Sequence, residues 1–205
     1  MWAKDIETHK RATRHVVSHT QGAAEFMIDI VPVILSGGAG SRLWPLSTTA
    51  KPKQFHALYS HNSMFSDTLA RVSGQTFQGF GPPIVVCGVD HEHQVRCELQ
   101  AAGQDQARII LEPLARNTAP ALAAAALAQA QIDPDCLMLV LPADHVIARP
   151  EQLHQACAYA RDVALSGAIV TFAITPSAPE TGYGYIKSGA RLAPHVFEVQ
   201  AFRES

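Results

Sequence analysis

The stretch that decides the fold is IVPVILSGGAG, residues 30–40. Its first part, residues 30–35, is apolar almost throughout and ends at a cluster of glycines. A short apolar run of this kind is typical of a parallel strand that is buried on both faces. Residues 30–35 are therefore expected to form a first strand, followed directly by a glycine-rich turn.

Short apolar runs alternate with amphipathic stretches through residues 30–170. This alternation predicts an α/β fold, a Rossmann-like, mostly parallel sheet flanked by helices. Further strands are expected at residues 84–87, 108–111, 137–141 and 169–174. Helices are expected at residues 64–72, from a capping Asp90 to about residue 102, at 118–131, and at 152–165 closed by Gly167. From Pro176 onward the sequence predicts hairpins over one end of the sheet.

The two ends of the chain depart from this pattern. Residues 1–26 show no apolar periodicity, and Met27 stands directly before the first expected strand. We expect residues 1–26 to be an extension that is either loosely ordered or upstream of a genuine start at Met27. Residues 27–205 are expected to be an incomplete domain, truncated at its C-terminal side, because the sequence stops just after a strand-like run at 197–202.

Composition excludes several classes of protein. The 205 residues carry 16 basic and 18 acidic side chains, which argues against a nucleic-acid partner. The longest apolar stretches, residues 119–128 and 137–143, fall short of the ~20 residues that cross a bilayer. Charged residues interrupt the first 26 positions, so no secretory leader is expected there and the predicted location is cytoplasmic.

The cysteines and histidines do not suggest a metal centre. The four cysteines form no CxxC pair, and we expect reduced, mostly buried thiols. His91 and His93 are two positions apart, whereas the helical zinc motif HExxH places its ligands one turn apart. Both histidines are therefore expected to be exposed residues of a first helical turn.

The glycine-rich turn is the strongest chemical signal. Gly37, Gly38 and Gly40 let backbone N–H groups approach a ligand, and such a loop suits phosphate oxygens. The spacing fits neither a dinucleotide-binding fingerprint nor a Walker A loop. Arg42 and Lys53 would add positive charge. The alternative is an ordinary glycine-rich turn with solvated cations.

Asp144 follows the expected strand at 137–141, at the sheet edge where ligands of α/β proteins bind. It is the candidate ligand for Mg²⁺, which is commonly held by one or two carboxylates together with substrate phosphates. The alternative is that Asp144 caps the next turn. His145, beside it, is interpreted as a structural hydrogen-bonding residue.

Two further segments carry candidate ligand contacts. Residues 112–120, EPLARNTAP, link a strand to a helix and would place polar groups where they can read a nucleobase. The alternative is a helix cap by Asn117 or Thr118. Residues 179–185, PETGYGY, offer glycines and tyrosine faces that suit a sugar, or else form a tight hairpin.

The order and spacing of these motifs resemble the sugar nucleotidyltransferases, and within them the mannose-1-phosphate guanylyltransferases. The resemblance runs from about residue 31 to 202 and includes LSGGAGSRLWPL, PKQF, EP with RNTAP, LPADH and ETGYGY. It implies a nucleotide-diphospho-sugar transferase fold and the Mg²⁺-dependent conversion of GTP and mannose 1-phosphate to GDP-mannose and pyrophosphate. No membrane partner is expected, and the sequence leaves a homo-oligomer open.

The resemblance also implies roles for individual residues. The three glycines would cradle the nucleotide, while Arg42 and Lys53 would neutralise its phosphates and Asp144 would hold the metal. The expected base and sugar contacts are Glu112, Arg116 and Asn117 for guanine, and Glu180, Gly182 and Tyr183 for the sugar. The sugar phosphate is already anionic, so its oxygen can attack the α-phosphorus in line without a catalytic base.

The sequence departs from the family at its end. Relatives continue beyond a Phe-x-Glu-Lys-Pro segment to a second metal-binding aspartate, whereas this sequence has Ser205 in place of the lysine and stops. We therefore expect negligible transferase activity from the 205-residue chain alone. The alternatives are a non-catalytic nucleotide-binding or interaction module and a transferase for another sugar 1-phosphate.

Overall fold

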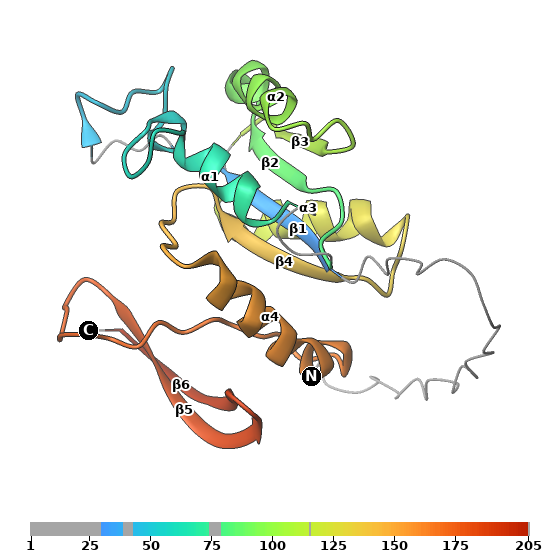
Figure 1. The fold of residues 1–205 in the computed structure, drawn as a ribbon, viewed down its shortest axis with the longest axis vertical. Helices are drawn as coiled ribbons and strands as arrows, with labels where there is room; N and C mark the ends of the chain where they lie inside the picture. The colour runs from blue at the N-terminus through green and yellow to red at the C-terminus, as the bar shows by residue number, and fades with distance from the viewer. Residues whose placement is uncertain (1–29, 39–42, 74–78, 115, 205) are drawn as a thin grey trace, which may run out of the picture.

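The computed structural model describes residues 30–38, 43–73, 79–114 and 116–204. In these ranges a four-stranded parallel sheet carries helices on both faces, and an antiparallel hairpin follows it (Figure 1). The expected α/β architecture is confirmed. None of the helices in the described ranges is long and apolar enough to cross a bilayer.

The sheet has the strand order β3-β2-β1-β4, with parallel pairing throughout. Its strands are β1 (Ile30–Ser36), β2 (Ile84–Gly88), β3 (Arg108–Glu112) and β4 (Leu137–Pro142). Each strand ends one residue beyond the range expected from its apolar run. The central strand is β1, in which Ile34 is in register with both Val85 and Leu141.

The four expected α-helices are also present, together with two short 3-10 helices. They are η2 (Lys53–Phe55), α1 (Met64–Arg71), η3 (Val89–His91), α2 (Glu92–Ala101), α3 (Thr118–Ala130) and α4 (Pro150–Leu165). Ser63 caps α1, because its hydroxyl accepts the N–H of Ser66 at 3.0 Å. Gly167 follows α4 with φ 98°, a left-handed conformation that favours glycine.

Apolar side chains bury the two faces of the sheet in separate clusters. On one face, α1, α2 and α4 pack over a cluster that contains Ile34 and Phe65, both 0% exposed. On the other face, Ala121 and Ala125 of α3 pack near Val33. Because alternate residues of β1 enter opposite clusters, this strand is the centre of the fold.

The fifth strand expected at residues 169–174 is not formed. This segment has no regular secondary structure, and Ile169 and Ile174 are 96% and 93% exposed. In the described ranges β4 pairs only with β1, so its other edge stays open. An apolar run forms an edge strand only when it pairs with a neighbouring strand and is covered by another layer of the fold. Among the described residues, this segment has neither a paired strand nor a covering layer.

The hairpin consists of β5 (Gly184–Ala193) and β6 (Val196–Glu204), which confirms a strand at residues 197–202. Its expected position over one end of the sheet is wrong. Figure 1 shows it beside α4, on the side away from the sheet, and the ring of Tyr159 in α4 lies 4.8 Å from that of His195. Because residues 169–174 do not join the sheet, the chain after α4 does not return to the edge of β4.

Two expectations near α2 also need correction. Asp90 does not cap the helix, because it lies within η3 and α2 begins after His91, which makes no side-chain cap. His91 is half-buried rather than exposed. Its Nε2 donates to the carbonyl of Thr49 at 2.9 Å, and its ring lies 6.1 Å from that of Phe55. His93 is exposed as expected.

The four cysteines are all free, and their environments differ. Cys87 and Cys157 are buried, Cys136 is half-buried and Cys97 is exposed. Burial raises the pKa of Cys157 to about 11. Burial also raises the pKa of Cys87 to about 11, with a further contribution from the nearby carboxylates of Glu92 and Glu112. These two thiols are therefore protonated near neutral pH.

We expect Ellman's reagent at pH 8 to modify Cys97 first and to leave Cys87 and Cys157 unmodified until denaturant is added. With a pKa of about 11, a thiol is ~0.1% ionised at this pH, and burial also blocks the reagent. Absorbance at 412 nm gives the rates. Cys97→Ser should remove the fast phase. A fast phase that survives in this variant and maps to Cys87 or Cys157 would contradict the described core.

Candidate functional site

The candidate site lies at the carboxyl edge of the sheet, between β1 and β4. The chain runs from β1 to β2 and β3 on one side and then returns to β4 on the other, so the strand order reverses at this point. Ligands of open α/β sheets bind outside the strand ends at such a reversal. The glycine-rich segment follows β1 here, and Asp144 follows β4.

Lys53 and Asp144 come together at this edge. The N–H of Ala143 donates to the carbonyl of Leu35 at 3.0 Å, which continues the β1–β4 ladder up to Asp144. The Nζ of Lys53 lies 2.8 Å from Oδ2 of Asp144, and the two side chains are 30% and 39% exposed. The residues predicted to bind phosphate and metal are thus partners of each other.

Gln54, which the sequence did not single out, connects η2 to the end of β1. Its side chain is 3% exposed, and its Nε2 donates to the carbonyl and hydroxyl oxygens of Ser36, each at 3.4 Å. Phe55 packs in the same turn, with its ring 5.7 Å from that of Phe65. The turn that carries Lys53 is therefore held against both β1 and α1.

The glycines described at this edge leave room on their outer side. Gly38 has φ 94°, where only glycine is unstrained, and a Cβ placed on it would meet no atom of the described residues within 4 Å. A Cβ on Gly37 would lie 3.9 Å from Oε2 of Glu112, so that carboxylate is beside the start of the loop. Gly40 and Arg42, also predicted to bind the nucleotide, lie outside the described residues.

Asn117 has an unusual backbone conformation at the start of α3. Its φ of 65° and ψ of −173° fall in a region that is almost restricted to glycine, and its side chain makes no cap hydrogen bond. The interpretation of Asn117 as an ordinary side-chain cap is therefore wrong. Both Asn117 and Arg116 are exposed, and strained residues of this kind cluster at binding sites.

A buried arginine supports the segment that follows Asp144. Arg71 in α1 is 5% exposed, and its Nη2 donates to the carbonyl of His145 at 3.1 Å. Burial lowers the pKa of its guanidinium, while the charge of Asp67 opposes this shift. His154 in turn donates to the carbonyl of Arg71 at 2.8 Å. No periodic signal in the sequence distinguishes this buried arginine from a solvated one.

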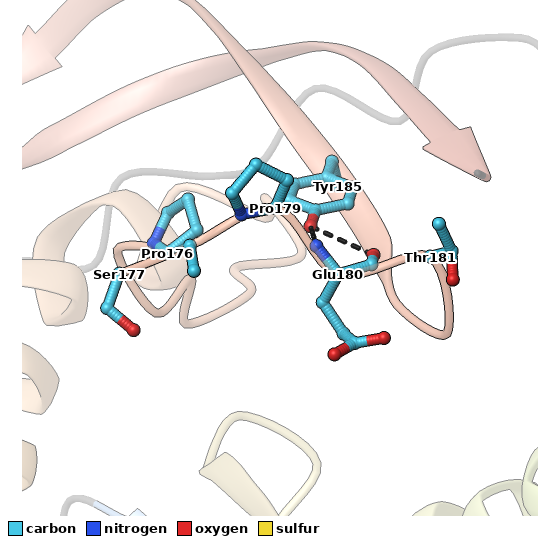
Figure 2. A pocket seen from close by; sticks show the side chains of 7 residues that line it. Pro176, Ser177, Pro179, Glu180, Thr181 and Tyr185 are labelled. Atoms are coloured by element: carbon cyan, nitrogen blue, oxygen red, sulfur yellow. Dashed lines mark hydrogen bonds between the residues drawn. The ribbon is translucent and has the colours of Figure 1, made fainter.

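The predicted sugar contacts lie in a different part of the chain. Glu180 borders an open hollow of about 520 Å³, lined by residues 176–181 and Tyr185 (Figure 2). The hydroxyl of Tyr185 accepts the N–H of Glu180 at 2.8 Å and donates to its carbonyl at 3.0 Å. The N–H of Gly182 donates to Oε1 of Glu180 at 3.2 Å. These hydrogen bonds are local, and Tyr183 is exposed nearby.

The donor set limits the kind of metal site that this edge can form. In the described ranges, no group of three or more His, Cys, Asp or Glu side chains is arranged to hold a metal ion. Asp144 provides one partly exposed carboxylate at the strand end. This fits a Mg²⁺ ion whose other ligands are substrate phosphates and water, and does not fit an ion held by these side chains alone.

Residues 31–205 match the family model described as nucleotidyl transferase. The chain belongs to this family. Members of the family typically use a divalent metal ion.

Relatives within the family are named for sugar and polysaccharide synthesis. The chain is 47% identical over 163 residues to a mannose-1-phosphate guanylyltransferase of Klebsiella pneumoniae, covering 80% of this chain and 34% of the relative. It is 46% identical over 177 residues to the alginate biosynthesis protein AlgA of Pseudomonas aeruginosa, covering 85% of this chain and 36% of AlgA. The chain thus spans about a third of the length of these curated relatives.

A solved structure of the family has a similar fold. It is described as a mannose-1-phosphate geranyltransferase from Thermus thermophilus, with 31% sequence identity and a TM-score of 0.71. The similarity covers 86% of this chain and 50% of that chain.

The strained conformation of Asn117 predicts an unusual effect of glycine. We expect Asn117→Gly to raise the free energy of unfolding by about 1 kcal/mol, because glycine adopts the observed φ and ψ without strain. Asn117→Ala, which removes the same amide but keeps a Cβ, should lower it. Urea denaturation of the three proteins gives the comparison. If the alanine variant is as stable as the glycine variant, the conformation of this residue is not the cause.

Proposed function

We propose that this chain provides the nucleotide-binding part of an enzyme that converts GTP and mannose 1-phosphate to GDP-mannose and pyrophosphate. The observation that carries the proposal is the meeting of Lys53 and Asp144, at 2.8 Å, at the sheet edge where the strand order reverses. The choice of substrates is supported by relatives such as the guanylyltransferase of Klebsiella pneumoniae.

The polyphosphate would lie along the loop after β1. The space outside Gly37 and Gly38 allows backbone N–H groups to approach phosphate oxygens. Lys53 would contribute a positive charge, and we retain Gly40 and Arg42 as predicted contacts. Glu112, beside Gly37, and the exposed residues Arg116 and Asn117 are proposed to recognise guanine.

Asp144 is the proposed ligand of Mg²⁺. A bound Mg²⁺ ion would supply charge neutralisation for the phosphates. In this structure Lys53 is paired with the carboxylate of Asp144, so binding requires both side chains to change partners. Lys53 would turn to a phosphate oxygen, and Asp144 would be left with a free carboxylate to coordinate the ion.

The transfer requires that the two substrates are aligned and that their negative charges are neutralised. A phosphate oxygen of mannose 1-phosphate forms a bond to the α-phosphorus of GTP, and the bond from that phosphorus to the bridging oxygen breaks to release pyrophosphate. The attacking oxygen is already anionic, so no side chain needs to remove a proton. Lys53 would offset the repulsion between the two anions. Glu180, Gly182 and Tyr183 are proposed to contact the sugar.

We also propose a cytoplasmic location. Four free thiols are typical of proteins from a reducing compartment. Nucleic acid and membrane are not proposed as partners, and the proposed ligands are GTP and mannose 1-phosphate. The sequence leaves a homo-oligomer open.

A second candidate function is nucleotide binding without turnover. It is favoured by the local character of the hydrogen bonds around Glu180, which tie that residue to its own turn. These hydrogen bonds do not set the position of a sugar phosphate relative to Lys53. The two candidates share the nucleotide site and differ in whether transfer follows binding.

The paired charges predict effects of opposite sign on the binding of a fluorescent GTP analogue. Lys53→Ala should weaken binding by about 10-fold in EDTA and in Mg²⁺, because a phosphate partner is lost. Asp144→Ala should bind at least as tightly as the wild type in EDTA, since Lys53 is then unpaired, but should gain nothing from Mg²⁺.

The matched control is Lys187→Ala, which removes an exposed lysine of β5 and should leave both affinities unchanged. Fluorescence titrations in the two buffers measure all four proteins. Equal losses in Lys53→Ala and Lys187→Ala would indicate a nonspecific charge effect and would contradict the proposed site.

Turnover by the chain alone is a separate test. We expect the 205-residue chain, supplied with GTP, mannose 1-phosphate and Mg²⁺, to yield no GDP-mannose above an Asp144→Ala control, because the hydrogen bonds of Glu180 with Gly182 and Tyr185 do not place the sugar contacts near Lys53. Chromatography of the nucleotides detects the product. Steady formation of GDP-mannose above that control would show that the chain alone completes the transfer.

A further inference from the structure

We propose that Gln54 is a positioning residue that fixes Lys53 relative to Asp144 and to the start of the glycine loop. The nucleoside triphosphate that Lys53 would bind is taken from the proposed function, on which this inference rests. The position of Lys53 can also be tested without any ligand.

Gln54 joins two segments that are far apart in the sequence. It lies in η2, immediately after Lys53, and its Nε2 donates to the carbonyl and hydroxyl oxygens of Ser36. Ser36 is the last residue of β1, is 0% exposed and directly precedes Gly37. One buried amide therefore connects the turn that carries Lys53 to the residue from which the glycine loop begins.

The same end of β1 also fixes Asp144. The carbonyl of Leu35 accepts the N–H of Ala143 at 3.0 Å, and the next carbonyl, that of Ser36, accepts the side chain of Gln54 at 3.4 Å. Neighbouring carbonyls of one central strand thus anchor the segments that carry the two charges. This shared anchor explains how the ammonium and the carboxylate come within 2.8 Å of each other.

The other contacts of the turn do not direct it toward β1. At its end, the N–H of Met64 donates to the carbonyl of His56 at 3.1 Å, which ties the turn to the start of α1. Phe55 is 4% exposed and packs against Phe65 and His91, with ring centroids 5.7 and 6.1 Å away. Apolar packing holds the turn to the body of the protein but is weakly directional. Hydrogen bonds weaken steeply when they are misaligned, so the amide of Gln54 specifies the orientation of the turn relative to β1.

The donor character of the amide makes the role testable. Gln54→Leu keeps an apolar body of similar size and removes the donor. Gln54→Glu keeps the shape but directs a carboxylate at the carbonyl oxygen of Ser36, which can only accept. This contact is unfavourable unless the carboxyl group is protonated and donates. The glutamate variant should therefore recover the wild-type geometry as the pH falls. A role in core packing alone predicts instead that Gln54→Leu, which keeps the apolar body, behaves like the wild type.

The first measurement uses the full chain without ligand. Trace acylation of lysines, followed by mass spectrometry, gives the reactivity of Lys53 relative to Lys187 in the same sample. We expect this ratio to rise by about threefold or more in Gln54→Leu, because the amine is released from Asp144. Gln129→Leu is the matched control, since Gln129 is a buried residue of α3 and its Oε1 accepts from the guanidinium of Arg108.

The second measurement is titration with Mg²⁺ and the fluorescent GTP analogue between pH 5.5 and 8.5. Gln54→Leu should bind about 10-fold more weakly at every pH. Gln54→Glu should bind weakly at pH 8.5 and approach the wild type at pH 5.5. Gln129→Leu should lower the free energy of unfolding, measured in urea, without changing the affinity.

The outcomes separate the two proposals. An unchanged Lys53 ratio in Gln54→Leu, or a change equal to that in Gln129→Leu, would overturn the positioning role. Equal affinity of the wild type and Gln54→Leu would overturn it as well. If the Lys53 ratio rises as expected while the wild type binds no Mg²⁺ and GTP analogue, Gln54 positions Lys53 and it is the proposed function that fails.

Discussion

The rest of the structure depends on the pairing of β1 on both of its edges. Parallel ladders join β1 to β2 and β4, and its alternate side chains enter both buried clusters. A strand held on four sides in this way has little freedom at its carboxyl end. The carbonyls of Leu35 and Ser36 therefore act as fixed points, and the segments that carry Lys53 and Asp144 hydrogen-bond to them or to their neighbours.

The ion pair that results is well suited to exchange. Lys53 and Asp144 are each about one third exposed, and pairs of this kind contribute about 0–1 kcal/mol to stability. Separating the two side chains costs little free energy compared with the attraction that each of them gains from a metal ion or a polyphosphate. Until such partners displace it, the pair keeps opposite charges together, so the carboxylate of Asp144 is neutralised at this edge. The contact is thus better understood as a resting state than as a structural bond.

The sequence predicts those parts of the molecule that are determined by patterns of neighbouring residues. Strands buried on both faces need continuous apolar runs, which is why all four sheet strands could be located. The same signal fails at residues 169–174, because it does not reveal whether a partner covers the run. Lys53 and Asp144 could be proposed from their places after strands and glycines, but their mutual pairing depends on a distant contact. Gln54 has no periodic signature, since a single buried amide resembles an exposed one in the sequence.

The two halves of the proposed reaction differ in how their geometry is set. Long-range contacts of the sheet hold the nucleotide side, whereas the turn around Glu180 is held by hydrogen bonds within residues 180–185. In-line attack requires reacting atoms about 3–3.5 Å apart and aligned. Local hydrogen bonds can shape a sugar-binding turn but cannot set its distance from Lys53. Transfer therefore needs contacts that place this turn against the sheet edge, and binding of the nucleotide does not.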